Sequence, residues 1–584
     1  MIDLNLQRAK FTAASDIGAH GAWTREAIVC LGGMLIGLAF ASYLYGWGIL
    51  DGANVGWLLD GGDTSSHFLG WDFFRHDVWR WPPGANPTFG YVVGNSIVFS
   101  DSFPLLAMPF KLIRALLPDP FQYQGLALYG NFMLNGGFAA VLAYRLSGRA
   151  GSALIVAALI VTGTIVTSRG FGAHGHDTLT AHWLILAAFV LVWTRQTRGV
   201  ERGRLGWVLL IAVSALTHFY LLVMVLAIWA IEWFALYIRE PRSGGRLIRH
   251  GLAVAAALFA VTYLAGYFSG AGAAPNTTGF GYFSANLLTF FNPHSGAWFF
   301  KFPTGFGVTS LSKFLPNLPE RGDGQYEGQA YMGLGLLIMV GVGACCWLLG
   351  KSFNLSRGAR VLSVAAGLLA LLAFSNVVCV GDKEILNLHV GPRLATLFGV
   401  ARASGRFIWV LYYLLVFGAF LAIARYFSPK ATLACLSVVL LLQMADLAPW
   451  HRYLHNASRH LPETPAIAND AALNRLLSGS ARMVFLPVKN IPEGFGIFSY
   501  MAARHGVAVN ATYSARTSET LLAQANQLET AKLQSGAAMP DEVYVVDPSA
   551  GADFGLTGPV CRQAAMECLA SGWGQIVVMR KRAQ

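Results

Sequence analysis

The chain has 584 residues, of which 55% are hydrophobic and only 12% are charged, and its mean hydropathy is +0.50. An ordinary soluble domain carries roughly 25% charged residues, so this composition excludes that class and indicates a polytopic membrane protein. A formal charge of +12 could point to a nucleic-acid partner, but the Arg and Lys residues lie in short gaps between apolar runs. Membrane topology explains these cations better, and we expect no nucleic-acid partner.

Apolar runs that could cross about 30 Å of hydrocarbon need roughly 20 helical residues, or fewer where protein shields them. Eleven runs meet this description: 26–49, 121–144, 152–168, 178–194, 206–219, 220–238, 250–268, 328–349, 361–379, 405–425 and 431–448. Alternate connecting segments are short and basic, so the positive-inside rule puts the N-terminus in the cytoplasm. The alternative is that 206–238 forms one long helix, which would switch the side of every later segment.

This topology divides the chain into a cytoplasmic tail (1–25), a membrane domain (26–448) and an extracytoplasmic C-terminal domain (449–584). Within the membrane domain, the segments 50–120, 269–327 and 380–404 are predicted to be outer loops. In the C-terminal domain, ARMVFLPV, DEVYVVDP and GQIVVMRK are typical of short strands, and 518–534 is typical of a helix. The predicted fold class is therefore mainly α, with about eleven transmembrane helices and a small α/β or α+β domain. Cys561 and Cys568 are candidates for a local disulfide in that domain.

The motifs of several enzyme classes are missing from the sequence. It contains no P-loop, no G-x-S-x-G, no H-E-x-x-H and no C-x-x-C pair. We therefore expect no nucleotide cofactor.

The first outer loop concentrates acidic groups directly after the first apolar run. Asp60, Asp63 and His67 lie within it, and a carboxylate at headgroup depth is partly desolvated and can act as a base. On a helix, Asp63 and His67 would share a face, so the imidazole could orient the carboxylate or help to bind a substrate hydroxyl. The alternative interpretation is a solvated interfacial loop with an aromatic belt.

Other polar groups are predicted on the same outer side. The substrate-binding candidates are Asp101, Arg169, His174, His176, His182 and His218. The H-G-H-D element has the ligand types of a zinc site but no defined helical spacing, and such histidines more often satisfy buried backbone groups. An Arg close to lipid is costly unless it meets an anion, and a lipid phosphate is available at that depth. Arg393, Arg402 and Arg406 are therefore the phosphate-binding candidates; the alternative is that they snorkel to headgroups.

Several of these elements together resemble one enzyme superfamily. The Asp-x-x-x-His element, the later H-D-T-L-T-A-H, T-H-F-Y and R-A-S-G-R-F elements and the outer C-terminal domain are similar to the GT-C integral-membrane glycosyltransferases. The resemblance covers nearly the whole chain in architecture, with weak motifs. It implies a polyprenyl-phosphate-linked sugar donor, an extracytoplasmic glycan, lipid or protein acceptor, and a first-loop acid as general base. Asp63 matches that acid best and Asp60 second, although Thr64 stands where the commoner motif has Glu.

The resulting hypothesis is glycosyl transfer in a bacterial inner membrane. Asp63 would be the base, Asp60 a helper or metal ligand, and His67 an orienting group, while Arg402 or Arg406 would hold the lipid phosphate. A divalent cation, Mg or Mn, is a possible cofactor. Two alternatives stay open: a transporter or flippase of lipid-linked sugars, and a membrane acyl- or phospho-transferase centred on His182 or His218.

Overall fold

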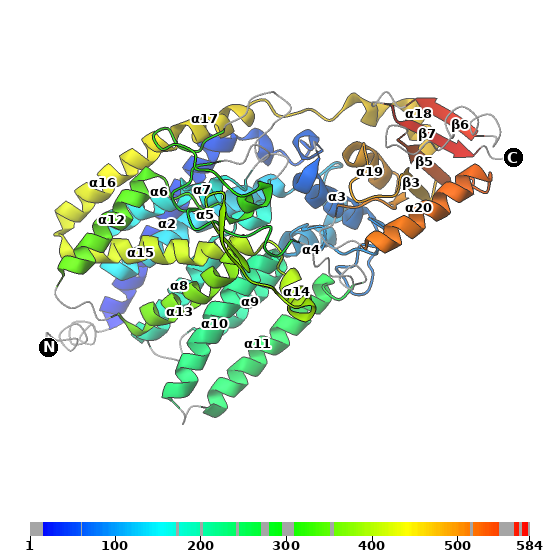
Figure 1. Cartoon of the computed structure of the whole chain (residues 1–584). Helices are drawn as coiled ribbons and strands as arrows, with labels where there is room; N and C mark the ends of the chain where they lie inside the picture. Colours follow the sequence, from blue (N-terminus) through cyan, green and yellow to red (C-terminus); the bar gives the residue numbers. More distant parts are fainter. Residues whose placement is uncertain are drawn as a thin grey trace.

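The protein is described here from a computed structural model that covers residues 16–59, 61–170, 175–198, 203–240, 244–269, 279–294, 309–350, 355–513, 518–547, 566–570 and 575–581. Figure 1 shows two parts: a bundle of long helices and, at the opposite end of the molecule, a small domain that contains the strands β3–β7. The prediction of a mainly helical chain with a small C-terminal sheet is confirmed.

The bundle is built from helices that coincide with the apolar runs of the sequence. They are α2 (Asp16–Tyr45), α5 (Gln124–Ser147), α6 (Ala150–Val161), α8 (Trp183–Arg198), α9 (Arg204–Thr217), α10 (Phe219–Arg239), α11 (Gly244–Ala265), α12 (Leu334–Leu349), α13 (Arg357–Phe374), α15 (Trp409–Tyr426) and α16 (Pro429–Asp446). Within the described residues, eight helices are long and apolar enough to cross a membrane, whereas α6, α9 and α12 are shorter. A multi-pass membrane protein is thus indicated, but the predicted count of eleven spans is not confirmed.

The run at 206–238 is broken rather than continuous. His218 separates α9 from α10 with an extended backbone (φ −163°, ψ 137°), and its Nδ1 accepts a hydrogen bond from the Tyr220 amide at 3.1 Å. The side chain therefore caps α10, because it satisfies one of the free amides of the first turn. This break separates the two predicted apolar runs and places His218 at the junction.

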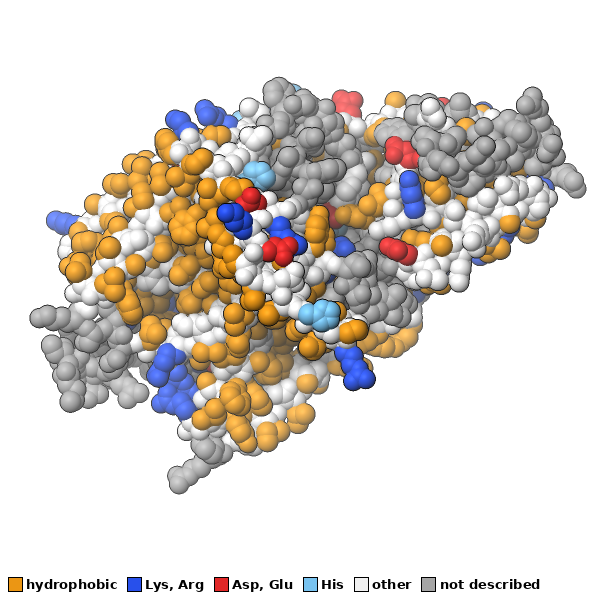
Figure 2. Space-filling view, viewed as in Figure 1, with side chains coloured by type: hydrophobic (Ala, Val, Ile, Leu, Met, Phe, Trp, Pro, Cys, Tyr) orange, Lys and Arg blue, Asp and Glu red, His pale blue; other side chains and the backbone are white. Residues whose placement is uncertain are grey.

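Helices α2 and α5 pack closely along a stripe of glycines. A Cβ added at Gly33 would lie 2.3 Å from the carbonyl oxygen of Gly136, and one at Gly37 would lie 2.1 Å from that of Phe132. Two glycines four residues apart let the helix backbones approach to a distance that larger side chains forbid. The bundle also exposes many large apolar side chains, among them Leu31, Leu252 and Leu441, and Figure 2 shows hydrophobic side chains spread over its surface. Such a surface fits a lipid environment.

The segment 50–120 folds into a compact structure instead of an open loop. It contains α3 (Gly62–His76), most of which is buried, and α4 (Pro104–Leu112). Between α13 and α15 lie the antiparallel hairpin of β1 (Val377–Val380) and β2 (Lys383–Asn387) and the short helix α14 (Pro392–Gly399). The helix α17 (Ala448–Ala457) follows the bundle and leads toward the C-terminal domain.

The C-terminal domain is a five-stranded mixed sheet of order β4-β3-β5-β7-β6. The strands β4 (Ala508–Val509), β3 (Arg482–Leu486) and β5 (Glu542–Val546) are parallel, and β7 (Val577–Lys581) and β6 (Met566–Ala570) run antiparallel to their neighbours. The domain's helices are α18 (Ala471–Leu477), α19 (Phe495–Arg504) and α20 (Glu519–Gln534), and Ser518 caps α20. The predicted strands and helix are thus present. Cys568 is disulfide-bonded, and its predicted partner Cys561 lies outside the described residues.

Candidate functional site

Helix α3 is the element that presents the first acidic group. It begins at Gly62, after a glycine at φ 96°, and Asp63 lies in its first turn with a partly exposed side chain. Ser66 and His67, one turn later, lie on the same face, as their spacing predicts. The hydroxyl of Thr64 donates to the Gly175 carbonyl at 3.2 Å, and this bond joins α3 to the segment that carries His176.

Asp63, Ser66, His67 and His176 line a cavity of about 280 Å³, which is near the lower end of the range for small-molecule sites. The wall is assembled from segments that are far apart in the sequence. It includes Asp63, Ser66, His67, Val98, Phe99, Ser100, Asp101, His176, His218, Phe219, Tyr220, Tyr267, Phe283, Tyr326, Glu327, Gly399, Val400, Arg402, Ala403, Arg406 and Tyr513. The sequence-based candidates Asp63, His67, Asp101, His176, His218, Arg402 and Arg406 are therefore brought together on one wall.

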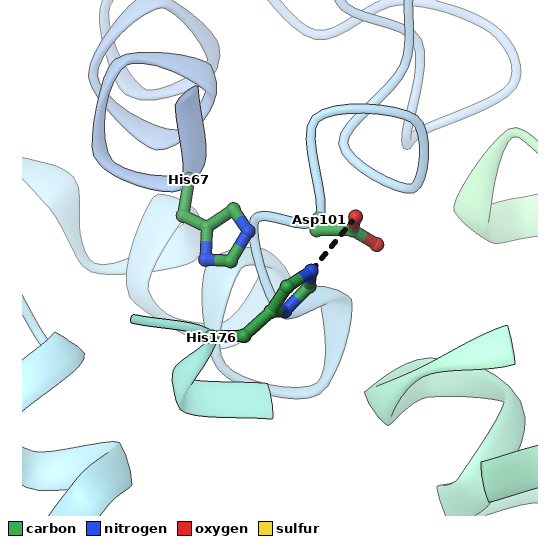
Figure 3. A group of neighbouring side chains, drawn as sticks. All are labelled: His67, Asp101 and His176. Carbon is green, nitrogen blue, oxygen red and sulfur yellow. Dashed lines mark ion pairs between the residues drawn. The ribbon is translucent and has the colours of Figure 1, made fainter. Parts of the chain in front are cut away.

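Three imidazoles surround one carboxylate in this wall. The Nε2 atoms of His176 and His218 each lie 3.7 Å from an oxygen of Asp101, and the rings of His67 and His176 have centroids 4.4 Å apart. Figure 3 shows His67, Asp101 and His176 converging from three separate segments. Asp101 has a left-handed backbone (φ 49°), a conformation that Asp tolerates better than most residues. The turn thereby directs its carboxylate between the two histidines.

His67 is oriented by a buried carboxylate that sequence reasoning did not assign. Its Nδ1 lies 2.9 Å from Oδ1 of Asp177, while Asp63 acts on the ring through its charge. Burial disfavours the charged imidazole, but the hydrogen bond and charge of Asp177, together with Asp101 and Asp63, hold the pKa of His67 above its usual value. Because Nδ1 is bonded to a carboxylate, the neutral ring carries its proton there and leaves a lone pair on Nε2.

The group His67, Asp101 and His176 has the geometry of a divalent-cation site. One ligand atom from each residue lies within 4.8 Å of the others. The Asp177–His67 pair matches the carboxylate that usually supports a metal-bound histidine, and burial keeps the pKa of His176 well below its usual value, which favours the neutral ligand form. His218 fits less well, since its Nδ1 already accepts a hydrogen bond and its Nε2 must then carry the proton. Two imidazoles with one carboxylate suit zinc or manganese better than magnesium.

A buried ion network forms another part of the wall. Glu327 accepts hydrogen bonds from Arg406 at Nε (2.8 Å) and Nη2 (2.7 Å) and from Arg169 at Nη2 (2.8 Å). Burial alone would raise the pKa of Glu327, but the two guanidinium groups lower it to about 2. Arg406 also lies 4.7 Å above the centre of the Tyr220 ring. The sequence indicated that Arg406 needs an anion, and within the protein that anion is Glu327.

Arg402 differs from Arg406 in its surroundings. It is half-buried at the cavity wall and lies 5.3 Å from the centre of the Phe283 ring. Among the residues that the structure describes, no carboxylate pairs with it. Its charge is therefore available to an anion in the cavity.

The C-terminal domain supplies Tyr513 to the same wall. The Tyr513 carbonyl accepts a hydrogen bond from Ser66 Oγ at 2.9 Å, and its hydroxyl hydrogen-bonds the Asp63 carboxylate. The charge of Asp63, followed by burial, raises the pKa of Tyr513 well above its usual value. Asp63 is thus held by a residue 450 positions later in the sequence, which no local pattern could have predicted.

The remaining candidates lie elsewhere. Asp60 and His174 are outside the described residues. Arg169 is behind Glu327, and Arg393 is exposed on α14; neither lines the cavity. His182 is also absent from the cavity wall, because it is fully buried against Trp409 and Tyr413. This position does not favour the acyl-transfer alternative that centres on His182.

Comparison with protein-family models shows the family to which the chain belongs. The model described as "Domain of unknown function (DUF6311)" matches residues 34–448, and the "DUF6311 C-terminal domain" matches 472–567. The chain belongs to the DUF6311 family. The two models divide this family member at the junction between its bundle and its C-terminal domain.

Comparison with known proteins gives no close relative. No curated protein matches the sequence. Among solved structures, the chain is similar to the archaeal oligosaccharyltransferase AglB from Archaeoglobus fulgidus, in complex with an inhibitory peptide and a dolichol-phosphate (TM-score 0.43) and in the apo form (TM-score 0.42). Both are 12% identical, and the alignments cover 83% of this chain and 64% of the other. The chain therefore spans less than two thirds of the length of these proteins.

Proposed function

We propose that this DUF6311 protein is a membrane glycosyltransferase that moves a sugar from a polyprenyl-phosphate carrier to a hydroxyl of an extracytoplasmic glycan, lipid or protein. The observation that carries the proposal is that Asp63, a partly exposed carboxylate, and Arg402, a cation without an ion pair among the described residues, line one cavity. A base and an anion-binding group on a shared cavity are the two requirements of a transfer from a lipid phosphate.

In the proposed reaction, the acceptor oxygen forms a bond to the anomeric carbon while the bond from that carbon to the phosphate oxygen breaks. Asp63 takes the proton of the acceptor hydroxyl, and the electron pair of the broken bond leaves with the lipid phosphate. The charge of Arg402 stabilises this leaving group, and no nucleotide is required. The Tyr513 hydroxyl engages one side of the Asp63 carboxylate and so limits its rotation.

The network around Glu327 has a supporting role in this proposal. Glu327 neutralises part of the charge of Arg406 and Arg169, so these cations form a fixed positive wall behind the phosphate position. A divalent cation held by His67, Asp101 and His176 would add Lewis-acid stabilisation of negative charge in the cavity. The chain would work in a bacterial inner membrane with its N-terminus in the cytoplasm and its C-terminal domain outside.

The test is a transfer assay with purified protein in liposomes, using polyprenyl-phosphate-linked hexoses and pentoses that carry a radiolabel in the sugar. We expect Asp63→Asn to lower the turnover by about 10²–10⁴-fold while the protein still binds polyprenyl phosphate. Arg402→Gln should weaken the binding of polyprenyl phosphate. The matched controls are Asp51→Asn, in the same outer segment, and Arg393→Gln, on the exposed face of α14.

Two results would contradict the proposal. One is an Asp63→Asn variant that transfers sugar as fast as Asp51→Asn. The other is accessibility labelling of a cysteine placed at position 63 that locates it on the cytoplasmic side.

A further inference from the structure

A second group of ligand-type side chains lies at the far end of α3. Asp72 and His76 are four residues apart on its last turns, and Asp119 approaches from the segment before α5. One ligand atom from each of the three lies within 4.8 Å of the others, and none of the three lines the cavity. Asp63 is nine residues earlier, or about 13 Å along the helix axis. This group is therefore separate from the site described above.

The Asp72 carboxylate is buried without hydrogen bonds. Its side chain is 0% exposed, and neither oxygen has a hydrogen-bond partner in the described part of the chain. Among the described residues, the basic group that lies within 4 Å of this carboxylate is the imidazole of His76, whose Nδ1 is 3.5 Å from Oδ1. A buried carboxylate without hydrogen bonds calls for a counter-charge in direct contact.

The imidazole of His76 is held in the form that binds a metal. Its Nδ1 donates to the Asp72 carbonyl oxygen at 2.8 Å, so the lone pair of the neutral ring is on Nε2. That Nε2 lies 3.7 Å from Oδ1 of Asp119. A histidine that donates one N–H to a backbone carbonyl and offers its other nitrogen is the usual arrangement of a metal ligand.

Arg75 fixes the segment that carries Asp119, and it acts on Asp72, as Arg504 does, only through electrostatic attraction without an ion pair. Its Nη2 donates to the carbonyl oxygens of Leu117 (3.3 Å) and Pro118 (2.5 Å), and its Nη1 lies 3.6 Å from Oδ1 of Asp119. Within the described residues, no ion pair joins Arg75 to Asp72. The Asp119 side chain is 46% exposed, so the group has an open path to solvent.

We propose that Asp72, His76 and Asp119 bind a divalent transition-metal cation of the zinc or manganese class. One imidazole and two carboxylates suit these ions, whereas calcium and magnesium prefer shells made only of oxygen. Ligand atoms about 2.0–2.2 Å from a tetrahedral ion lie roughly 3.3–3.6 Å from one another. The distance of 3.7 Å between Nε2 of His76 and Oδ1 of Asp119 requires only a small shift to reach this geometry, and the Asp72 carboxylate lies within 4.8 Å of both groups.

The bound cation joins the C-terminal end of α3 to the segment that leads into α5. Because α3 carries Asp63 and His67 in its first turns, this link fixes the helix that forms one side of the cavity. The inference does not depend on the proposed glycosyl transfer, since it concerns only the binding of an ion.

The experiment measures zinc and manganese binding to the full-length purified protein in detergent, after removal of the purification tag and extraction with a chelator. Competition with a chelating dye gives the affinity, and elemental analysis gives the stoichiometry. We expect His76→Gln and Asp72→Asn to lose one equivalent of the preferred ion or to bind it at least about 100-fold more weakly, since even loss of a supporting partner costs 10–100-fold. Asp77→Asn is the matched control, because Asp77 pairs with Arg80 outside the group.

A separate variant distinguishes this site from the cavity. His176→Gln should remove any ion held by the cavity histidines and leave the equivalent bound by Asp72 and His76 unchanged. Asp119→Asn, at a partly exposed position, decides the result if a buried variant does not fold. The proposal is overturned if the wild-type protein binds neither ion in competition with the dye, or if folded Asp119→Asn and His76→Gln keep the stoichiometry and affinity of Asp77→Asn.

Discussion

The substitution Glu327→Gln tests whether the buried ion network holds the segment before α12 to the segments that carry Arg169 and Arg406. The side chain keeps its size but loses its charge, while Arg169 and Arg406 keep theirs at 4% and 8% side-chain exposure. Two buried guanidinium groups would then lose the negative charge of Glu327. We expect a large loss of stability, because breaking a buried pair costs far more than the pair itself contributes.

The magnitude follows from two independent considerations. Removal of one partner of a buried ion pair typically costs about 3–5 kcal/mol. The fall in the pKa of Glu327 from its ordinary 4.5 to about 2 corresponds to about 3 kcal/mol of preferential stabilisation of the charged form. We therefore expect Glu327→Gln to lower the free energy of unfolding by about 3–4 kcal/mol.

The assay is equilibrium unfolding in mixed detergent micelles, followed by tryptophan fluorescence. Glu384→Gln is the matched control, because Glu384 pairs with Arg321 at the surface and both side chains are 36% exposed. That substitution should change the stability by no more than about 1 kcal/mol. A Glu327→Gln protein that unfolds within about 1 kcal/mol of the control would refute the reasoning.

Three further outcomes are expected. Because the pKa of Glu327 is depressed to about 2, its contribution to the free energy of unfolding is present above pH 4.5 and is lost as the pH falls toward 2. The difference in unfolding free energy between wild type and Glu327→Gln, measured at several pH values, should therefore be constant from pH 5 to 7 and become smaller below about pH 4. Gly37→Ala should reduce the yield of folded protein in size-exclusion chromatography, since its Cβ would lie 2.1 Å from the Phe132 carbonyl oxygen, whereas Gly130→Ala meets nothing within 4 Å and should behave as wild type. Tyr513→Phe, which removes only the hydroxyl that bonds Asp63, should lower the unfolding free energy by about 1 kcal/mol; an unchanged value would mean that the bond does not form.

Much of the fold could be predicted from the sequence because lipid imposes a strong local signal. Each of the eleven apolar runs coincides with a helix, and the strands at 482–486, 542–546 and 577–581 fall within the predicted segments. The composition could not decide whether 206–238 is one helix or two. That break depends on a single histidine, His218, which caps α10 with its own side chain. Nor could it show that 50–120 folds into a compact segment around α3, since that requires packing against α19, more than 400 residues later.

The sequence could indicate which types of residue form the candidate site, but not which residues contact one another. Asp63, Asp101 and Arg402 share a cavity, but their catalytic roles stay predictions. Their partners were not predictable, because an ion pair such as Glu327–Arg406 joins segments 79 residues apart and leaves no periodic pattern. The sequence correctly indicated that Arg406 needs an anion close by. It could not indicate whether that anion is Glu327 or a lipid phosphate. A carboxylate directly before the apolar run at 328–349 was the one available signal.

The contact between Tyr513 and α3 has a consequence for how this family can vary. Tyr513, from the C-terminal domain, forms part of the cavity wall, so neither half of the chain forms the complete cavity alone. A chimera that combines the bundle of one family member with the sheet domain of another would keep both folds and still misalign the carboxylate of Asp63. We therefore expect the bundle and the C-terminal domain of each family member to have evolved together.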